Sequence, residues 1–298
     1  EMTELFTGLD GGGAFREDRW TRDGGGGGVT RILSDGKTFA KAGVNRSAVD
    51  GILPFGASQR LGGRMLPGEQ ASFFATGLSL VVHPRNPHVP TVHLNVRYFE
   101  LTDQRGRLRD AWFGGGTDLT PMYPSTNDAR VFHCALRAAC EQHHRTLYPR
   151  FKMQCDEYFQ SAHRGGEARG VGGVFFDHVR PDEDDSGLTA TELFDFGGAL
   201  VRSLRDAYAP IVEHRRSAAY GERERQLQLR RRGRYAEFNL LHDRGTLFGL
   251  QTGARVESVL MSLPPEAAWT YAHEGGTDPL ESALLAMLIP RDWAGEED

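Results

Sequence analysis

Residues 91–99 alternate apolar and polar side chains in the sequence Thr-Val-His-Leu-Asn-Val-Arg-Tyr-Phe. A period of two is typical of a β-strand whose two faces meet different environments, so a strand is predicted here. After an initial threonine, its polar face carries His93, Asn95 and Arg97. Polar groups that leave water need partners, so this row has two interpretations. It faces bulk solvent, or it lines a pocket for an anionic ligand.

Length and charge limit the classes of protein to consider. The chain has 298 residues and a formal net charge of −5 at pH 7. This length supports a sizeable hydrophobic core, and the acidic balance argues against nucleic acid as a partner. No long uncharged apolar run is present, so no membrane span is expected. An acidic substrate remains compatible, because local arginines such as Arg85, Arg97 and Arg255 can dominate the potential of a pocket.

Three cysteines, Cys134, Cys140 and Cys155, have no spacing that suggests a zinc site or a disulfide framework. Small buried thiols are the simplest interpretation of all three. Their number and spacing favour a reducing compartment, and we expect a cytoplasmic protein.

Strands and helices follow from periodicity and turn signals. The predicted strands span 30–33, 77–83, 91–101, 173–177, 235–242 and 256–263. The predicted helices span 128–147, 150–162, 189–208 and 279–288. Early strands, a middle block of helices and returning strands favour an α+β fold. We expect a single domain over 1–298, with a large, mostly antiparallel β-sheet and α-helices packed on both faces.

Two other segments receive a plain structural interpretation. The glycines at 24–28 lack the lysine and hydroxyl residue of a phosphate loop. They also lack a preceding strand, because 20–23 does not have a strand pattern. The charged run 223–234 is expected to be a solvated helix face or loop.

Three islands of polar and small residues stand apart from these patterns. The first, residues 79–88, leads into the strand with His93. The second, 112–121, has three glycines before Asp118. The third is 249–257.

In these islands and between them, the sequence resembles oxygen-dependent coproporphyrinogen III oxidase, an enzyme family of haem biosynthesis. The resemblance covers nearly the whole chain. The matching segments are 18–20, 24–28, 42–45, 83–87, 95–97, 113–121, 170–177, 219–225, 233–239 and 244–253. Long matches in the same order are far more specific than one short motif.

The resemblance implies an enzyme that converts two propionate side chains of coproporphyrinogen III to vinyl groups, giving protoporphyrinogen IX. It implies molecular oxygen as co-substrate and no organic cofactor, with the protein supplying orientation, charge and proton transfer. One alternative is a non-catalytic tetrapyrrole carrier or sensor on the same scaffold. Another is a different oxygenase that acts on another polycarboxylate.

The resemblance also implies site residues. The implied substrate-binding residues are Ser79, Asn95, Val96, Arg97, Gly253, Ala254 and Arg255. Arginine suits the four propionates, because a guanidinium binds carboxylate with two parallel hydrogen bonds. The implied catalytic residues are His93 as a proton donor, Arg97, and Asp118 as the acceptor of pyrrole N–H groups. The three preceding glycines would let backbone approach a flat macrocycle.

Each of these residues also has a structural interpretation. Arg97 and Arg255 could form structural salt bridges. Asp118 could cap a turn, and His93 could be a buried structural histidine. The family motifs favour the functional interpretation in each case.

Four histidines, His83, His93, His133 and His163, match residues proposed as metal ligands in bacterial relatives. Their spacing is not diagnostic of any metal. We expect no metal, with this set as the alternative.

The family resemblance implies a homodimer with contacts through roughly 235–270, although apolar residues there are equally compatible with a core. It also adds the mitochondrial intermembrane space as an alternative to the cytoplasm, should a targeting segment have been removed. The sequence departs from the family at Gln154, at Ala254 and at an extra residue near Gly165.

Overall fold

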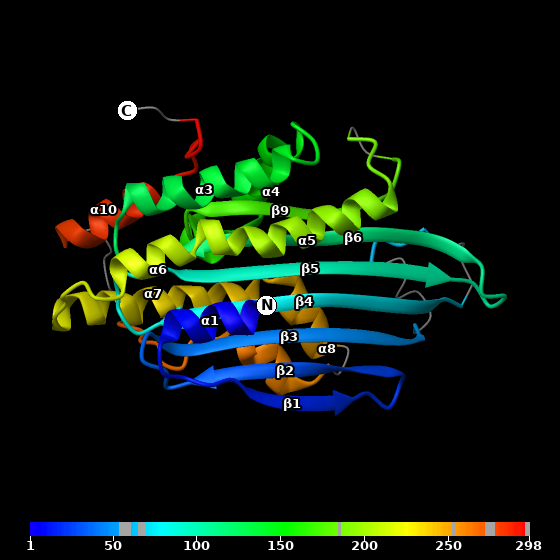
Figure 1. The fold of residues 1–298 in the computed structure, drawn as a ribbon, viewed down its shortest axis with the longest axis horizontal. Coiled ribbons are helices and arrows are strands. Elements are labelled where there is room, and N and C mark those ends of the chain that lie inside the picture. The colour runs from blue at the N-terminus through cyan, green and yellow to red at the C-terminus, as the bar shows by residue number, and fades with distance from the viewer. Residues whose placement is uncertain (54–60, 65–69, 184–185, 252–253, 272–277, 296–298) are drawn as a thin grey trace.

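The computed structural model describes residues 1–53, 61–64, 70–183, 186–251, 254–271 and 278–295. Within these residues seven strands form one antiparallel sheet in the order β1-β2-β3-β4-β5-β6-β9 (Figure 1). The strands are β1 (Arg16–Thr21), β2 (Gly26–Ser34), β3 (Phe39–Ile52), β4 (Ser72–Pro84), β5 (Thr91–Thr102), β6 (Leu108–Thr120) and β9 (Gly172–Val179). A small hairpin, β7 (Gln160–Ser161) with β8 (Glu167–Ala168), lies outside this sheet.

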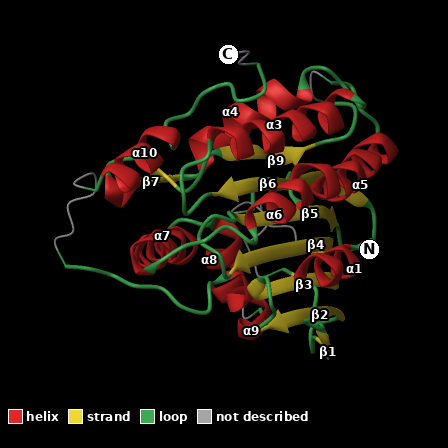
Figure 2. Ribbon diagram, turned by 60° about the vertical axis from the view of Figure 1, so that its left-hand side comes forward, coloured by secondary structure: helices red, strands yellow, loops and turns green. Residues whose placement is uncertain are grey.

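Helices cover both faces of the sheet (Figure 2). On one side lie α1 (Met2–Asp10), α5 (Ala190–Ala207) and α6 (Ala209–Arg215), with α3 (Thr126–Glu141) packed against α5. On the other side lie α7 (Glu222–Leu241), α8 (Arg244–Gln251), α9 (Val256–Val259) and the 3₁₀ turn η2 (Leu260–Ser262). The remaining helices are α4 (Leu147–Tyr158), η1 (Ala162–Arg164) and α10 (Pro279–Met287).

The first side holds the main hydrophobic core. Alternation on β5 sends Val92 and Leu94 into this core, where they are fully buried with Phe132 and Phe196. Burying a side chain of this size contributes about 1.5–3 kcal/mol relative to leaving it in water. The core therefore fixes which face of β5 remains for the polar residues.

Helix α4 packs along β9 and contacts both faces of that strand. Phe151 stacks on Phe176, which belongs to the main core. Two helical turns later, Tyr158 stacks on Phe175, which points to the second side of the sheet. The helix thus covers the edge of the sheet and closes one end of the space on the second side.

The expected fold class is confirmed as an α+β fold with an antiparallel sheet and helices on both faces. The strand predicted from residue 91 is β5, and the capping box of Thr189 with Glu192 begins α5. All four predicted helices exist with shifted ends. The expectation of a single domain over the whole chain stays a prediction.

Two predicted strands are wrong. The segment 235–242 is the end of α7, and 256–263 forms α9 and η2. In the first, the buried residues Tyr235 and Phe238 are three apart, which is a helical spacing that short apolar runs conceal.

Other segments also differ from expectation. The first strand, β1, covers residue 20, where no strand was expected, and β3 and β6 were not predicted as strands. The charged run 223–234 is helical, but Arg231 and Arg232 are buried. Arg232 donates to the Pro84 carbonyl over 2.7 Å, so this part of α7 packs on the end of β4. No described helix combines the length and the apolar composition that crossing a bilayer requires.

Candidate active site

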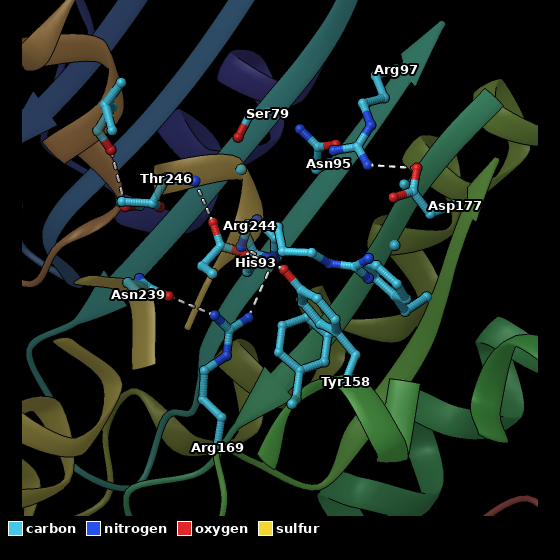
Figure 3. A pocket seen from close by; sticks show the side chains of 18 of the residues that line it. Ser79, His93, Asn95, Arg97, Tyr158, Arg169, Asp177, Asn239, Arg244 and Thr246 are labelled. Carbon is cyan, nitrogen blue, oxygen red and sulfur yellow. Dashed lines mark hydrogen bonds and ion pairs between the residues drawn. The ribbon is translucent and has the colours of Figure 1, made fainter. Parts of the chain in front are cut away.

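A cavity of about 320 Å³ lies on the second face of the sheet, between the strands and α7, α8 and η2. Figure 3 shows the side chains that point into it. Its lining residues are Ser79, His93, Asn95, Arg97, Gly115, Gly116, Tyr158, Phe159, Arg169, Phe175, Asp177, Asn239, Asp243, Arg244, Gly245, Thr246, Ser258, Val259, Met261 and Ser262.

Sheet register builds the floor. Ser79 on β4 pairs with Asn95 on β5, Asn95 pairs with Gly116 on β6, and Gly116 pairs with Phe175 on β9. These four residues form one row across four strands and all line the cavity. The polar face of β5 therefore lines a pocket, which decides between the two interpretations of its alternating pattern.

Next to this row, His93 is hydrogen-bonded to a buried carboxylate on the same face of the sheet. Asp118 is the register partner of His93, and the His93 Nδ1 lies 2.9 Å from the Asp118 Oδ1. Because a carboxylate accepts only, Nδ1 carries the proton. This tautomer leaves the His93 Nε2 as the nitrogen available to the pocket.

Arg169 completes this buried group. Its Nη2 and Nε donate to Asp118 over 2.6 and 3.2 Å, and its Nη1 donates to the Asn239 Oδ1 over 2.7 Å. The guanidinium also lies 4.1 Å from the ring centre of Phe159. Burial alone would raise the pKa of Asp118, but the charge of Arg169 and the hydrogen bond from His93 hold that pKa below its ordinary value.

A second ion pair occupies one end of the cavity. The Arg97 Nη2 lies 2.8 Å from the Asp177 Oδ1 (Figure 3). Gly114 is the register partner of Arg97, and a Cβ there would lie 2.8 Å from the Asp177 Oδ1 and 2.9 Å from the Arg97 Nε. This glycine therefore makes room for the ion pair, whereas Gly115 and Gly116 line the cavity.

The start of α8 forms the roof. Asp243 precedes the helix and accepts hydrogen bonds from the Thr246 backbone N–H at 2.7 Å and the Tyr158 hydroxyl at 2.9 Å. Burial would raise the pKa of Asp243, and the Thr246 N–H and the Arg169 charge lower it below its ordinary value. The next residue, Arg244, lies 4.8 Å from the centre of the Tyr158 ring. Its guanidinium pairs with no carboxylate in the described part of the chain.

The remaining wall is the turn around η2, which the sheet holds by backbone carbonyls. The Lys41 Nζ donates to the Leu263 carbonyl over 2.9 Å. The His83 Nε2 donates to the Ser262 carbonyl over 2.8 Å. Met261 lies against Gly43, where a Cβ would approach its side chain to 2.4 Å. These contacts place Ser262 and Met261 at the cavity.

The structure brings together Ser79, His93, Asn95 and Arg97 of the predicted site. Asp118 lies beside His93 on the neighbouring strand, is about 1% exposed, and has both of its oxygens hydrogen-bonded. It therefore orients His93, and its contact with pyrrole N–H groups stays a prediction.

Other predicted residues lie elsewhere. Val96 points to the main core. Gly253 is outside the described residues, and Ala254 does not line the cavity. Arg255 is not among the lining residues, and its Nη2 lies 2.5 Å from the Asp18 Oδ2 on β1. Arg255 thus forms a salt bridge here, and its contact with substrate stays a prediction.

The four histidines of the metal alternative do not converge. His83 bonds to the η2 turn, and His133 is buried between the Tyr148 hydroxyl at 2.9 Å and the Val171 carbonyl at 3.0 Å. His163 lies at the surface, 2.9 Å from the Glu237 Oε2. Among the described residues, no three His, Cys, Asp or Glu side chains are placed to share a metal ion.

Among the lining residues that sequence reasoning missed are Tyr158, Arg169, Asp177, Asp243 and Arg244. Asp177 and Arg244 lie inside segments that carried the family resemblance, so the motif boundaries contained a usable signal. No sequence signal marked Tyr158, because its position at the cavity depends on how α4 crosses the β9 edge.

Comparisons with known proteins show the family of this chain. A sequence model of the family described as coproporphyrinogen III oxidase matches residues 1–293. The chain is 49% identical over 287 residues to a Drosophila melanogaster protein named oxygen-dependent coproporphyrinogen-III oxidase, covering 95% of this chain and 72% of the fly protein. It is 47% identical over 310 residues to a protein of the same name from Synechococcus sp. (strain CC9605), covering 97% of this chain and 82% of the relative. These matches extend over the sheet and over every described element that lines the cavity, and the chain belongs to the coproporphyrinogen III oxidase family.

Proposed function

We propose that this chain is an oxygen-dependent coproporphyrinogen III oxidase. It converts two propionates of its substrate to vinyl groups and gives protoporphyrinogen IX in haem biosynthesis. Each conversion releases CO₂ and removes a hydride equivalent, two electrons and one proton, from the side chain; with one further proton from the medium this reduces one O₂ to hydrogen peroxide. Molecular oxygen is thus the co-substrate, and the reduced tetrapyrrole supplies the electrons without an organic cofactor.

The observation that carries this proposal is the pairing of cations with hydrogen-bonding groups in one cavity. Arg244 has no carboxylate partner in the described residues, and Arg97 presents a guanidinium that is 37% exposed. Both suit substrate propionates, because charge-assisted bonds to carboxylate are strong in a partly desolvated site. The buried Asn239 Nδ2 has no hydrogen-bond partner in the described structure and adds a donor on the same cavity wall.

Three groups have positions that suit proton handling. His93 presents Nε2 to the cavity while Asp118 fixes its ring, so it is the proposed proton donor and acceptor. Asp118, held beside His93, keeps the proposed role of accepting pyrrole N–H groups, and Asp243 is a second candidate acceptor because it lines the cavity. Their lowered pKa values keep both ionised at neutral pH.

Purified protein supplied with coproporphyrinogen III and oxygen should release two CO₂ per tetrapyrrole and form protoporphyrinogen IX. A folded protein without turnover, under conditions in which a relative is active, would refute the proposal. Tight anaerobic binding without oxygen consumption would favour the carrier or sensor alternative instead. Consumption of oxygen with a different polycarboxylate, and not with this one, would favour the other oxygenase.

We also propose a homodimer through roughly 235–270. Five large apolar side chains there are exposed, which supports an interface in this segment. They are Leu240, Leu241, Leu250, Val256 and Trp269. Analytical ultracentrifugation should give a dimer that Leu241→Asp weakens and that Ile52→Asp, a change at an exposed residue outside this segment, leaves intact. A monomeric wild type would contradict this proposal.

A further inference from the structure

The ion pair at the end of the cavity raises a question that the proposed reaction does not answer. Arg97 is the strand residue best placed to bind a substrate carboxylate, yet it already contacts Asp177. We infer that Asp177 is an internal competitor for Arg97, which holds this guanidinium when no substrate carboxylate is bound and takes it back as product leaves. The inference rests on the proposed function, because it concerns the carboxylates of that substrate and product.

The geometry of the pair is that of an exchangeable contact. The pair has a single hydrogen bond of 2.8 Å between the Arg97 Nη2 and the Asp177 Oδ1. Arg97 is 37% exposed and Asp177 16% exposed, so water and ligand atoms can reach both partners. A propionate can offer Arg97 two parallel hydrogen bonds in place of this one. Exchange of one carboxylate for another therefore has little net cost.

Asp177 has other partners that keep it in place when Arg97 turns away. The His178 backbone N–H donates to the Asp177 Oδ1 over 3.0 Å. The His178 ring has its Nδ1 3.5 Å from the Asp177 Oδ2, and its Nε2 lies 2.7 Å from the Leu61 carbonyl. The same ring stacks on Trp112 at 4.9 Å between centroids. Asp177 is thus a fixed anion, and Arg97 with its long side chain is the partner that moves.

This arrangement matters most for product release. Protoporphyrinogen IX retains two of the four propionates, so a site that grips carboxylates also holds its product. A fixed aspartate beside Arg97 gives the cation an alternative partner at the moment of dissociation. Asp177 would therefore weaken binding and speed release, and it acts as a positioning residue for Arg97.

The test uses Asp177→Asn, which keeps the side-chain shape and the acceptor for the His178 N–H. Coproporphyrinogen III is titrated without oxygen, so that binding is measured without turnover, and protoporphyrinogen IX dissociation is measured by stopped flow. We expect the dissociation constant to fall at least tenfold and product release to slow by a similar factor, so that KM and kcat both fall. Asp177→Ser is the second variant should the first not fold.

Asp35→Asn is the matched control. Asp35 pairs with Arg85 at 3.3 Å but is 90% exposed and outside the cavity. Its φ of 55° also suits asparagine. This control should leave both constants unchanged.

A double-mutant cycle shows whether Asp177 changes the affinity for substrate through Arg97. If Asp177 acts through Arg97, Asp177→Asn should change affinity less than twofold in an Arg97→Met background. An equal gain in that background, or an unchanged or weaker affinity in the single variant, would overturn the inference. In either case a wild type that binds and turns over the substrate leaves the proposed function standing. A wild type that binds no coproporphyrinogen III overturns both.

Discussion

Two arginine–aspartate pairs at the pocket differ in their burial and in the number of hydrogen bonds that they share. Asp118 and Arg169 are each 2% exposed in their side chains and share two hydrogen bonds. Arg97 and Asp177 are 37% and 16% exposed and share one. The first pair lies beside His93 with the Arg169 guanidinium among aromatic rings, whereas both members of the second pair line the cavity.

The difference separates a structural use of charge from a ligand-binding use. Two charges removed from water are tolerable only when each compensates the other and further bonds satisfy the remaining atoms. Asp118 meets this condition through Arg169 and His93, so it cannot be released to a ligand without a large penalty. This condition does not apply to Arg97, because its guanidinium is partly exposed and water already solvates it. The enzyme thus keeps one cation fixed to shape the site and one available to bind.

The largest expected effect comes from breaking the buried pair. Arg169→Met leaves the Asp118 charge buried without its partner, which should lower the free energy of unfolding by about 3–5 kcal/mol. Urea denaturation followed by circular dichroism measures this. Adding Asp118→Leu should restore much of the stability, because apolar residues of similar volume replace buried pairs well, but not the activity. A single variant as stable as wild type would show that the two pairs do not differ.

Replacing Arg244, the cation at the roof of the cavity, should weaken substrate binding and leave the fold intact. Arg244 is exposed and has no carboxylate partner in the described residues, so Arg244→Met should change stability by less than about 1 kcal/mol. The anaerobic affinity for coproporphyrinogen III should fall about tenfold or more, since one charge-assisted contact is lost. Arg244→Lys should retain part of it. Unchanged affinity in the methionine variant would remove Arg244 from the binding account.

Acid should weaken the buried pair in a defined direction. The pKa of Asp118 is lowered in the folded protein from an ordinary value of 3.8. Its contribution to stability is therefore complete above about pH 4 and is lost as the pH falls through the folded value. Subtracting the stability of Asp118→Asn from that of wild type should give a difference that shrinks below pH 4. A difference that stays constant down to pH 2 would mean that Asp118 is not stabilised as an anion.

The smallest expected effect is the change in protein stability when the exposed pair of Arg97 and Asp177 is broken. Arg97→Met should change the free energy of unfolding by no more than about 1 kcal/mol, because half-exposed single-bond pairs contribute little. Thermal unfolding measures it, with the activity of the same sample as the contrast. A loss of several kcal/mol would make Arg97 a structural residue like Arg169.

Local patterns in the sequence predicted part of this architecture. The alternation in β5 identified both the strand and its functional face, because the buried side of a strand determines the other side. The pattern could not distinguish helix from strand at 235–242, where apolar residues are exposed as well as buried. Glycine-rich β6 carries too few side chains for a period-two signal, although it has a neighbouring strand on each side.

The candidate site was predictable where one strand supplies it and not where several elements converge. His93, Asn95 and Arg97 follow each other on β5, and the family motifs added Ser79. Arg169, Tyr158 and Asp243 come from three other segments that only the folded chain brings together. The role of Asp118 also depended on a partner, since the sequence does not show that Arg169 and His93 already occupy its oxygens.

The most direct test is a crystal structure of the protein with coproporphyrinogen III, grown and frozen without oxygen. We expect the macrocycle over the row of Ser79 and Asn95, one propionate on Arg97 with its bond to Asp177 broken, another on Arg244, and the Asp118–Arg169 pair unchanged. A tetrapyrrole bound on another surface, or bound here with Arg97 still on Asp177, would contradict the account.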